Sequence, residues 1–463
     1  MISEPATIAP PARSGNLLTD FAELLPRAVA ECVTDPAPVT GDPARFSPGF
    51  DLPRPDAGVQ RLYSAATTRW CPLGEYAGHR LTLLDLASNP GTHTTKTFAS
   101  LLIVARAIAY IRRTGEPITI FSPTSANKGT ALRDAVLRAI EAELVTPEQL
   151  RVVILAPESC RDKLRASRMS TDSTLRELNP LLLYRGAPAE SVKRLGREFV
   201  DAHAGQLKRE GRNLWFSLEL ANYLIADTAR AFFEHAVDPT DVSGGPRWHA
   251  HAVSSAFGML GYHHGRTVLE DAGLATPASR PATLLVQHMA TADMVLSLRT
   301  GSFERHGLPR YSAEPGTGLH RQDGEGDPHF PTTTYDPDET LDPTFYTRRP
   351  ATSPAMNELI GRFGGDGIVV SLHECLHRYP EIRAMLAGHE RGLPVDVRGL
   401  REWSLVMALT GVLNAVDRGL ITPGADIVVH GSGWYSADEY QPPGESSTTT
   451  VTTVDDIAAA VIG

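Results

Sequence analysis

From about residue 80 the chain repeats one pattern four times: a short apolar run typical of a buried strand is followed by a longer segment with helical periodicity. The four apolar runs are RLTLLDLA, PITIFSP, LRVVILAP and LLLYRG. Consecutive strand–helix units favour parallel strand pairing, because each helix supplies the crossover that a parallel connection needs. We therefore predict an α/β fold in which parallel sheets carry helices on their faces.

The remaining segments differ from these units. Residues 1–55 hold one amphipathic stretch between proline-rich segments, and we expect an N-terminal arm that wraps the body or a partner subunit. Residues 300–350 carry little periodicity and many Pro, Gly and Asp residues, a pattern typical of an insertion or a lid. The apolar runs GIVVS and DIVVHG then resume the α/β pattern.

Composition excludes several classes of protein. The 463 residues, 42% of them apolar, suffice for a large core, and the net charge of −10 offers no basic surface for nucleic acid. The four cysteines form no CxxC pair, which is typical of a reduced cytoplasmic chain. The N-terminus lacks a signal-peptide pattern, and no segment approaches the ~20 apolar residues of a membrane span. We expect a cytoplasmic protein without nucleic-acid or membrane partners.

Ligands of open parallel sheets bind beyond the carboxyl ends of the strands, so we examined the strand-to-helix turns. Four turns stand out: SNPGTHTTKTFAS with Lys96, SPTSANKGT with Asn127, SSAFGMLGYHHG, and HGSGWY with Ser432. Each also has an ordinary interpretation, namely an exposed lysine, a helix N-cap or a plain turn. None carries the glycine fingerprint of a nicotinamide-binding Rossmann domain.

The order of these turns resembles that of the pyridoxal-phosphate enzymes of fold type II, and within that group the chain resembles threonine synthase. LLDLASNPGTHTTKTF resembles the stretch that leads to the Schiff-base lysine, PTSANKGTA the asparagine loop, VSSAFGM the phosphate loop, and LITPGADIVVHGSGW the closing strand. TADMVLSLRTGSF and ATSPAMNELI resemble two further segments of the family. The resemblance spans about residues 80–440.

The resemblance implies roles for individual residues. Lys96 would be the catalytic lysine that binds pyridoxal 5'-phosphate, Asn127 would contact the phenolic oxygen of the cofactor, and Ser432 would meet its pyridine nitrogen. The residues implied for the cofactor phosphate are Ser254, Ser255, Ala256, Phe257 and Gly258. Backbone N–H groups and hydroxyls in the asparagine loop could hold the substrate carboxylate, at Ser122, Thr124 and Ser125.

The resemblance also implies a fold and a reaction. The fold would be that of the β subunit of tryptophan synthase: two parallel-sheet domains with the cofactor in the cleft between them. Residues 56–96 and 236–463 would form the large domain and residues 97–235 the small one. The expected reaction is an elimination or replacement at Cβ or Cγ of a small amino acid, as in threonine synthase or in specialised metabolism that makes a non-protein amino acid. A homodimer is one expected assembly, and a non-catalytic binding or regulatory relative is the alternative.

Three departures from the family pattern place the substrate in doubt more than the cofactor. Thr97 stands where relatives carry an acidic residue after the lysine, Ala126 replaces the glycine of the asparagine loop, and Ser255-Ala256 replaces Gly-Asn in the phosphate loop. Lys128 is the alternative Schiff-base lysine, but it lies inside the loop that should bind the ligand.

Two histidine-containing patterns could indicate a metal, and we expect none. HECLH at 373–377 matches the HExxH zinc-protease pattern, but Pro380 follows closely and no third ligand is evident. WHAHAV and YHHG place four histidines between 249 and 264. Acid–base residues of an active site, or ordinary core and turn histidines, explain this second group better than a metal site does.

Overall fold

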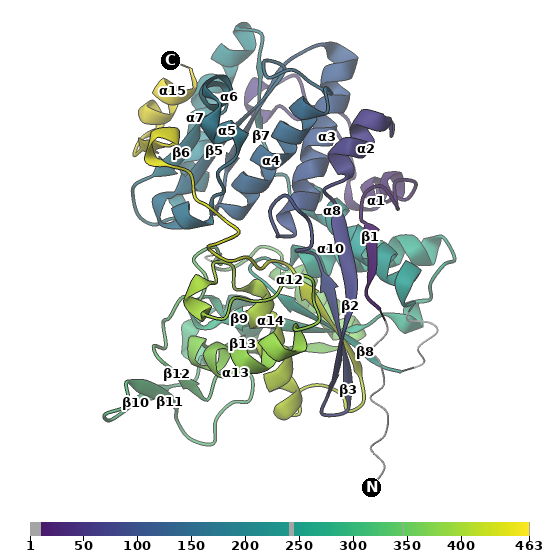
Figure 1. Ribbon diagram of the computed structural model, residues 1–463, viewed down its shortest axis with the longest axis vertical. Helices are drawn as coiled ribbons and strands as arrows, with labels where there is room; N and C mark the ends of the chain where they lie inside the picture. The colour runs from purple at the N-terminus through teal and green to yellow at the C-terminus, as the bar shows by residue number, and fades with distance from the viewer. Residues whose placement is uncertain (1–10, 240–244, 346, 463) are drawn as a thin grey trace.

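Two α/β lobes stacked along the long axis form the molecule, each around its own sheet (Figure 1). The computed structural model describes residues 11–239, 245–345 and 347–462. We call the lobe around the five-stranded sheet the small domain and the lobe around the seven-stranded sheet the large domain. A separate three-stranded sheet projects from the large domain.

The small-domain sheet is wholly parallel, in the order β15-β6-β5-β4-β7. Its strands are β4 (Ile118–Pro123), β5 (Leu150–Pro157), β6 (Leu181–Tyr184), β7 (Asn213–Phe216) and β15 (Thr449–Val451). Alternate residues of β4 belong to different cores, with Ile120 on one face and Phe121 on the other. Because both faces are buried, the central strands β4, β5 and β6 are mostly apolar.

Helices cover both faces of this sheet. On the face that carries Ile120, the covering helices are α3 (Lys96–Thr114) and α4 (Asn127–Glu141). The helices on the Phe121 face are α7 (Ser191–Arg209) and α15 (Val454–Val461). Both α3 and α4 directly follow a strand, so their N-termini lie at the edge of a sheet where the carboxyl ends of the strands meet.

The large-domain sheet has the order β1-β2-β3-β14-β8-β9-β13. Its strands are β1 (Arg13–Asn16), β2 (Thr67–Tyr76), β3 (His79–Asp85), β8 (Arg247–Ala252), β9 (Ala282–His288), β13 (Gly365–Val370) and β14 (Asp426–Gly431). The first three pair antiparallel and the remaining strands pair parallel. The expected α/β fold with two parallel-sheet domains is confirmed.

The large-domain sheet is also covered on both faces. Leu83 and Val429 share a core with α14 (Ser404–Asp417), whereas Leu84 and Val428 share the core of the opposite face. The helices of that opposite face are α8 (Ala221–Val237) and α10 (Phe257–Asp271).

Helix α8 lies against the large domain, although the sequence assigns residues 97–235 to the small one. The reason is a close contact with α10 at two glycines one turn apart. A Cβ on Gly261 would lie 2.4 Å from Cβ of Asp227, and a Cβ on Gly265 would lie 2.3 Å from the backbone oxygen of Thr228. The absence of side chains at these glycines lets the two helix backbones approach each other.

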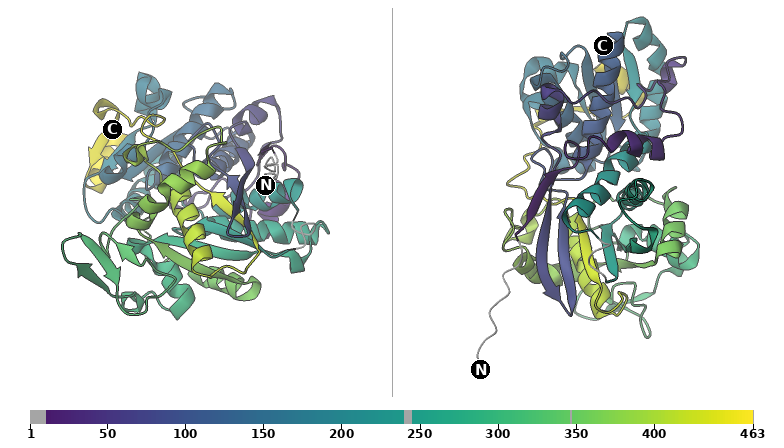
Figure 2. Two further views of the ribbon diagram at one scale, coloured as in Figure 1. Left: turned by 60° about the horizontal axis from the view of Figure 1, so that its bottom comes forward. Right: turned by 90° about the vertical axis from the view of Figure 1, so that its right-hand side faces the viewer.

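The N-terminal arm contacts both lobes. Strand β1 pairs with β2, and α1 (Leu25–Cys32) packs against α8 and α10. The chain then reaches the small domain, where a short helix at Pro43–Arg45 contacts α7 and β7. Figure 2 shows this purple segment along one side of the molecule. Helix α2 (Ala57–Tyr63) follows and packs against α3 and α4.

The region 300–350 contains the small sheet, with β10 (Tyr311–Glu314), β11 (Leu319–Gln322) and β12 (Thr333–Thr334) in antiparallel order. The remaining helices are α5 (Arg168–Thr171), α6 (Ser173–Leu178), α11 (Asp293–Thr300), α12 (Ser353–Phe363) and α13 (Leu372–Met385). No helix among the described residues is long and apolar enough to cross a membrane.

The C-terminal segment returns to the small domain, which corrects the expectation that all of 236–463 lies in the large domain. Strand β15 pairs in parallel with β6, and α15 packs against α7. Val451 and Ile457 belong to the core that contains Phe121. Burial of these side chains, and the hydrogen-bonding groups at the edge of β6, explain the return.

Candidate active site

A cavity of about 450 Å³ lies where the two domains meet. Its lining comes from the N-terminal turns of α3, α4 and α10, from residues of α8, from the segment after β14, and from Thr344, Phe345, Thr347 and residues 350–352. The cavity therefore lies beyond the carboxyl ends of parallel strands, the position at which α/β proteins bind ligands.

Three helices begin at this cavity, and in each of them the side chain of the N-cap residue makes no capping hydrogen bond. The N-cap residues are Thr95 for α3, Ala126 for α4 and Ala256 for α10, and none of their side chains accepts a hydrogen bond from its helix. The first N–H groups of a helix lack partners within the helix, and its N-terminus carries a partial positive charge. Three such termini around one cavity favour an anionic ligand.

The backbone at these turns is strained. His93, Ala126 and Ala256 have φ values of 53°, 105° and 51°. A non-glycine residue with positive φ costs roughly 1–3 kcal/mol and is concentrated at ligand sites. At Ala126 the angle lies well outside the left-handed helical range, so the alanine occupies a conformation that suits glycine better.

Lys96 is the first residue of α3 and borders the cavity. Its Nζ lies 5.5 Å from the ring centroid of Tyr223. Burial lowers the pKa of Lys96, and Arg230 lowers it further, while Asp227 and Glu402 oppose this shift. A lysine whose charged form is disfavoured can act as a nucleophile or a base nearer to neutral pH.

Lys128 is a second buried lysine at the same cavity. Its Nζ donates to the backbone oxygen of Ser217 at 2.8 Å and lies 5.4 Å from the ring centroid of Tyr223, the ring that Lys96 also approaches. Burial and the charge of Lys96 lower the pKa of Lys128 to about 7. The two amines therefore influence each other electrostatically across one aromatic ring.

Lys128 should make stability depend on pH. In the unfolded chain this amine stays protonated up to about its ordinary pKa of 10.5, whereas in the folded protein it loses the proton near 7. The unfolded state thus binds more protons between these values, so stability rises with pH there, by up to about 1.4 kcal/mol per unit. Urea unfolding should show that the difference in unfolding free energy between Lys128→Met and wild type, which favours the variant, shrinks as pH rises from about 7 to 10.5. A pH-independent difference between the two proteins would contradict this assignment.

The structure brings nearly all sequence-predicted residues to the cavity. Ser122 lies within β4 and is not among the lining residues, so its side chain is not at the cavity surface. The predicted residues that do line it are Lys96, Thr124, Ser125, Asn127, Ser254, Ser255, Ala256, Phe257, Gly258 and Ser432.

Neighbouring side chains fix the orientation of Asn127. Its Nδ2 donates to Oε2 of Glu402 at 2.7 Å, and its Oδ1 accepts from the hydroxyl of Tyr435 at 2.8 Å. An amide nitrogen carries two N–H groups, so one more donor remains for a ligand. Thr124 Oγ1 accepts from the N–H groups of Ala126 and Gly129, both at 3.3 Å, and so shapes the same loop.

Sequence reasoning missed several lining residues, among them Asp227, Arg230 and Glu402. Arg230 donates to Oδ1 of Asp227 at 2.8 Å and to Oγ1 of Thr95 at 2.8 Å. The available signal was the placement of Asp227 and Arg230, three residues apart, in the otherwise apolar run ANYLIADTARAFF. Two charges on one buried helix face indicate a polar site or a buried ion pair.

A buried ion-pair network adjoins the cavity. Lys163 Nζ lies 2.5 Å from Oδ2 of Asp342 and 2.7 Å from Oε2 of Glu402. Lys163 belongs to the small domain, Asp342 to the inserted region and Glu402 to the large domain, where it precedes α14. Although burial alone lowers the pKa of Lys163, the two carboxylates raise it, so the lysine stays charged. The network therefore joins three parts of the chain around the cavity.

The HECLH segment has a structural role here. It lies in α13, which continues through Pro380. Glu374 forms an ion pair with Arg418, and His373 makes an edge contact with Tyr335. Within the described residues these side chains are not part of a group of three potential metal ligands.

The two lobes and the cavity between them match the fold type II architecture, the fold of threonine synthase. The chain belongs to DUF6002, a family of unknown function, whose model matches residues 13–463. No curated protein matches the chain in sequence.

The fold assignment rests on threonine synthase from yeast, which superposes with a TM-score of 0.50 at 12% identity over 88% of this chain and 75% of that chain. Pyridoxal-phosphate-bound threonine synthase from Brucella melitensis gives 0.49 at 13% identity, over 82% of this chain and 78% of that chain. A serine ammonia-lyase from Rhizomucor miehei gives 0.48 at 14% identity, over 81% and 97%.

Proposed function

We propose that this protein is a pyridoxal-phosphate-dependent enzyme acting on a small amino acid. One observation carries the proposal: a lysine amine of lowered pKa, Lys96, borders a cavity on which the N-termini of α3, α4 and α10 converge. The cavity thus offers a nucleophilic amine together with binding groups for anions. An amino acid and a phosphorylated aldehyde cofactor require this combination.

The residues present fit the cofactor. Ser254, Ser255 and the first turn of α10 would hold its phosphate, Asn127 its phenolic oxygen and Ser432 its pyridine nitrogen. Gly258 supports this fit, since a Cβ there would lie 2.5 Å from Nη1 of Arg230. The glycine therefore lets a buried guanidinium reach the N-terminus of α10, which adds positive charge where the phosphate would bind.

When bound, the cofactor supplies an aldehyde that captures amino groups and a ring that withdraws electrons from Cα of an amino acid. The residues of the protein would move protons and orient the substrate. Lys96 would take a proton from Cα and return it at Cα or beyond. Thr124, Ser125 and the N-terminus of α4 would hold the substrate carboxylate. Thr344, Phe345, Thr347 and residues 350–352 would cover the cavity and exclude water.

Within this class we propose elimination or replacement at Cβ or Cγ, because the neutral hydroxyl of Ser432 would leave the pyridine nitrogen unprotonated and so temper carbanion formation. The altered loops favour a non-protein amino acid of specialised metabolism at least as much as threonine. The four cysteines are all free, which supports the cytoplasm as the location. We also propose a homodimer, and the alternative function is a non-catalytic relative that binds the cofactor or an amino acid.

Absorbance tests the proposal. The purified full-length chain, titrated with pyridoxal phosphate, should develop a near-ultraviolet or visible band that saturates at one cofactor per chain. Incubation with phosphohomoserine, O-acetylserine, O-acetylhomoserine or threonine should then yield a 2-oxo acid or a new amino acid. Absence of any band contradicts the proposal, and a saturating band without turnover of any amino acid supports the non-catalytic alternative.

A further inference from the structure

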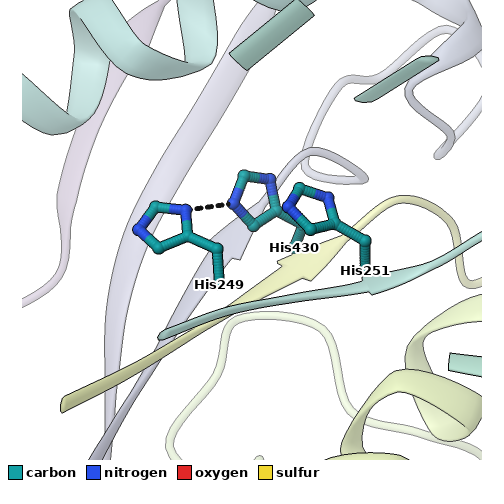
Figure 3. Close-up of side chains that lie close together, drawn as sticks. All are labelled: His249, His251 and His430. Carbon is teal, nitrogen blue, oxygen red and sulfur yellow. Dashed lines mark hydrogen bonds between the residues drawn. The ribbon is translucent and has the colours of Figure 1, made fainter. Parts of the chain in front are cut away.

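Three buried histidines lie side by side on one face of the large-domain sheet. His249 and His251 are alternate residues of β8, and His430 of β14 pairs with His251 in the parallel register. Figure 3 shows the three rings above the two strands, with a hydrogen bond between His249 and His430. His251 and His430 also line the cavity, so this cluster connects the cavity with the interior of the large domain.

One nitrogen from each ring lies within 4.8 Å of the others, a spacing that a shared metal ion would allow. Two features oppose a metal. The rings of His251 and His430 overlap at a tilt of 32°, with centroids only 3.9 Å apart, whereas ligands of one ion radiate from it. In addition, Nη1 of Arg230 lies 3.3 Å from Nδ1 of His430. Metal binding through Nε2 would put a proton on this Nδ1, and two donors would then face each other.

A chain of hydrogen bonds accounts for the same atoms without conflict. Arg230 can only donate, so Nδ1 of His430 accepts and its proton is on Nε2. This Nε2–H donates to Nδ1 of His249 at 2.9 Å. His249 then donates through Nε2 to Oε1 of Glu234 at 3.2 Å, and a carboxylate can only accept. The two ends of the chain therefore require both imidazoles to be neutral and protonated on Nε2.

Further hydrogen bonds hold both ends of this hydrogen-bond chain in place. Glu234 also accepts from Arg247 at 2.7 Å and from the hydroxyl of Tyr262 at 2.5 Å. At the other end, Nη2 of Arg230 donates to Oγ1 of Thr95, the residue before Lys96. The hydrogen bonds thus run from the interior of the large domain to the turn that carries the lysine.

We propose that Glu234, His249 and His430 form a positioning chain that holds Arg230 in one orientation, and that Arg230 positions Lys96 through Thr95 and through its fixed charge. The second part of this inference rests on the proposed function, in which Lys96 is the reactive amine. The charged groups that face Lys96 are Asp227 and Arg230 of α8, Glu402 before α14 and Lys128 of α4. Arg230 is the cation among them whose orientation the buried histidines set.

Nitrogen NMR of the wild-type chain, labelled with 15N at histidine, tests the positioning chain without any cofactor. His249→Gln and His430→Gln would assign the two rings by difference. We expect each ring to show one pyrrole-type Nε2 and one pyridine-type Nδ1 at neutral pH. A doubly protonated His430, the opposite tautomer, or metal-type shifts on addition of Zn²⁺ alone would overturn the positioning chain.

Amine reactivity tests the effect on Lys96. Acetic anhydride modifies neutral amines, and mass spectrometry of the Lys96 peptide measures the rate. Arg230→Gln removes the nearby cation, so the pKa of Lys96 should rise and its labelling near neutral pH should fall about tenfold. Arg230→Lys, which retains a charge but loses the planar fork, should give an intermediate loss.

Arg266→Gln is the matched control, because Arg266 is a buried arginine of α10 that contacts Ser279 instead of the cavity. It should leave the labelling of Lys96 unchanged. Equal labelling of wild type and a folded Arg230→Gln would overturn the role of Arg230. If Arg230→Gln does not fold, Arg230→Lys and His430→Gln decide the same question. Failure to bind pyridoxal phosphate would refute the proposed function alone, since neither measurement uses the cofactor.

Discussion

Lys96→Ala is expected to abolish the absorbance band that the full chain gives with pyridoxal phosphate, and to lower amino-acid turnover by about 10³-fold or more. The band needs a lysine amine joined to the cofactor, and turnover needs the same amine to move protons. Lys96 is suited to both tasks, because burial and Arg230 favour its neutral form and because it stands at the first turn of α3.

Lys128→Ala is the matched control for this result. Lys128 borders the same cavity, is more deeply buried and also has a lowered pKa, but its amine is bound to Ser217. This variant should keep the band, with a changed affinity for anions. If the band survived in Lys96→Ala and disappeared in Lys128→Ala, Lys128 would be the lysine that binds the cofactor. This result would contradict the assignment of Lys96.

Lys163→Ala is expected to cost about 3–5 kcal/mol of unfolding free energy, because it leaves two buried carboxylates without their cation. Side-chain exposure is 4% for Lys163, 0% for Asp342 and 1% for Glu402, so water cannot replace the lost partner. Urea unfolding followed by tryptophan fluorescence measures the difference. Cofactor binding should weaken as well, because Glu402 also orients Asn127.

Arg168→Ala is a useful comparison. The Arg168–Glu141 pair lies at the surface, with side-chain exposures of 60% and 45%, and exposed pairs contribute at most about 1 kcal/mol. If Lys163→Ala cost no more than Arg168→Ala, the buried network would not stabilise the joined domains.

The fold and the cavity's main turns could be predicted from sequence because their signals are local. A strand followed by a helix has a recognisable periodicity, and Lys96 and Asn127 each stand at such a boundary, where parallel sheets collect ligand-binding groups. Ser254 to Gly258 could be predicted for the same reason. Their roles toward a cofactor stay predictions that the proposed variants test.

Contacts between distant segments could not be predicted in this way. Lys163, Asp342 and Glu402 are far apart in the chain, and nothing near any of them in sequence shows that they meet. Arg230 meets His430 only because α8 packs over β14. Strand β15 has just three residues, and its position depends on the free edge of β6 rather than on its own pattern.

The return of the chain's end to β6 has a consequence for how ligands enter. The N-terminal arm joins the two lobes on one side of the molecule, and the segment leading to β15 joins them on the other (Figure 1). These two connections add to those that run from β3 to α3 and from β7 to α8, so a rotation that parts the lobes must bend several covalent connections at once. The elastic resistance of these connections limits the amplitude of opening, and with it the size of the molecule that can be admitted or released.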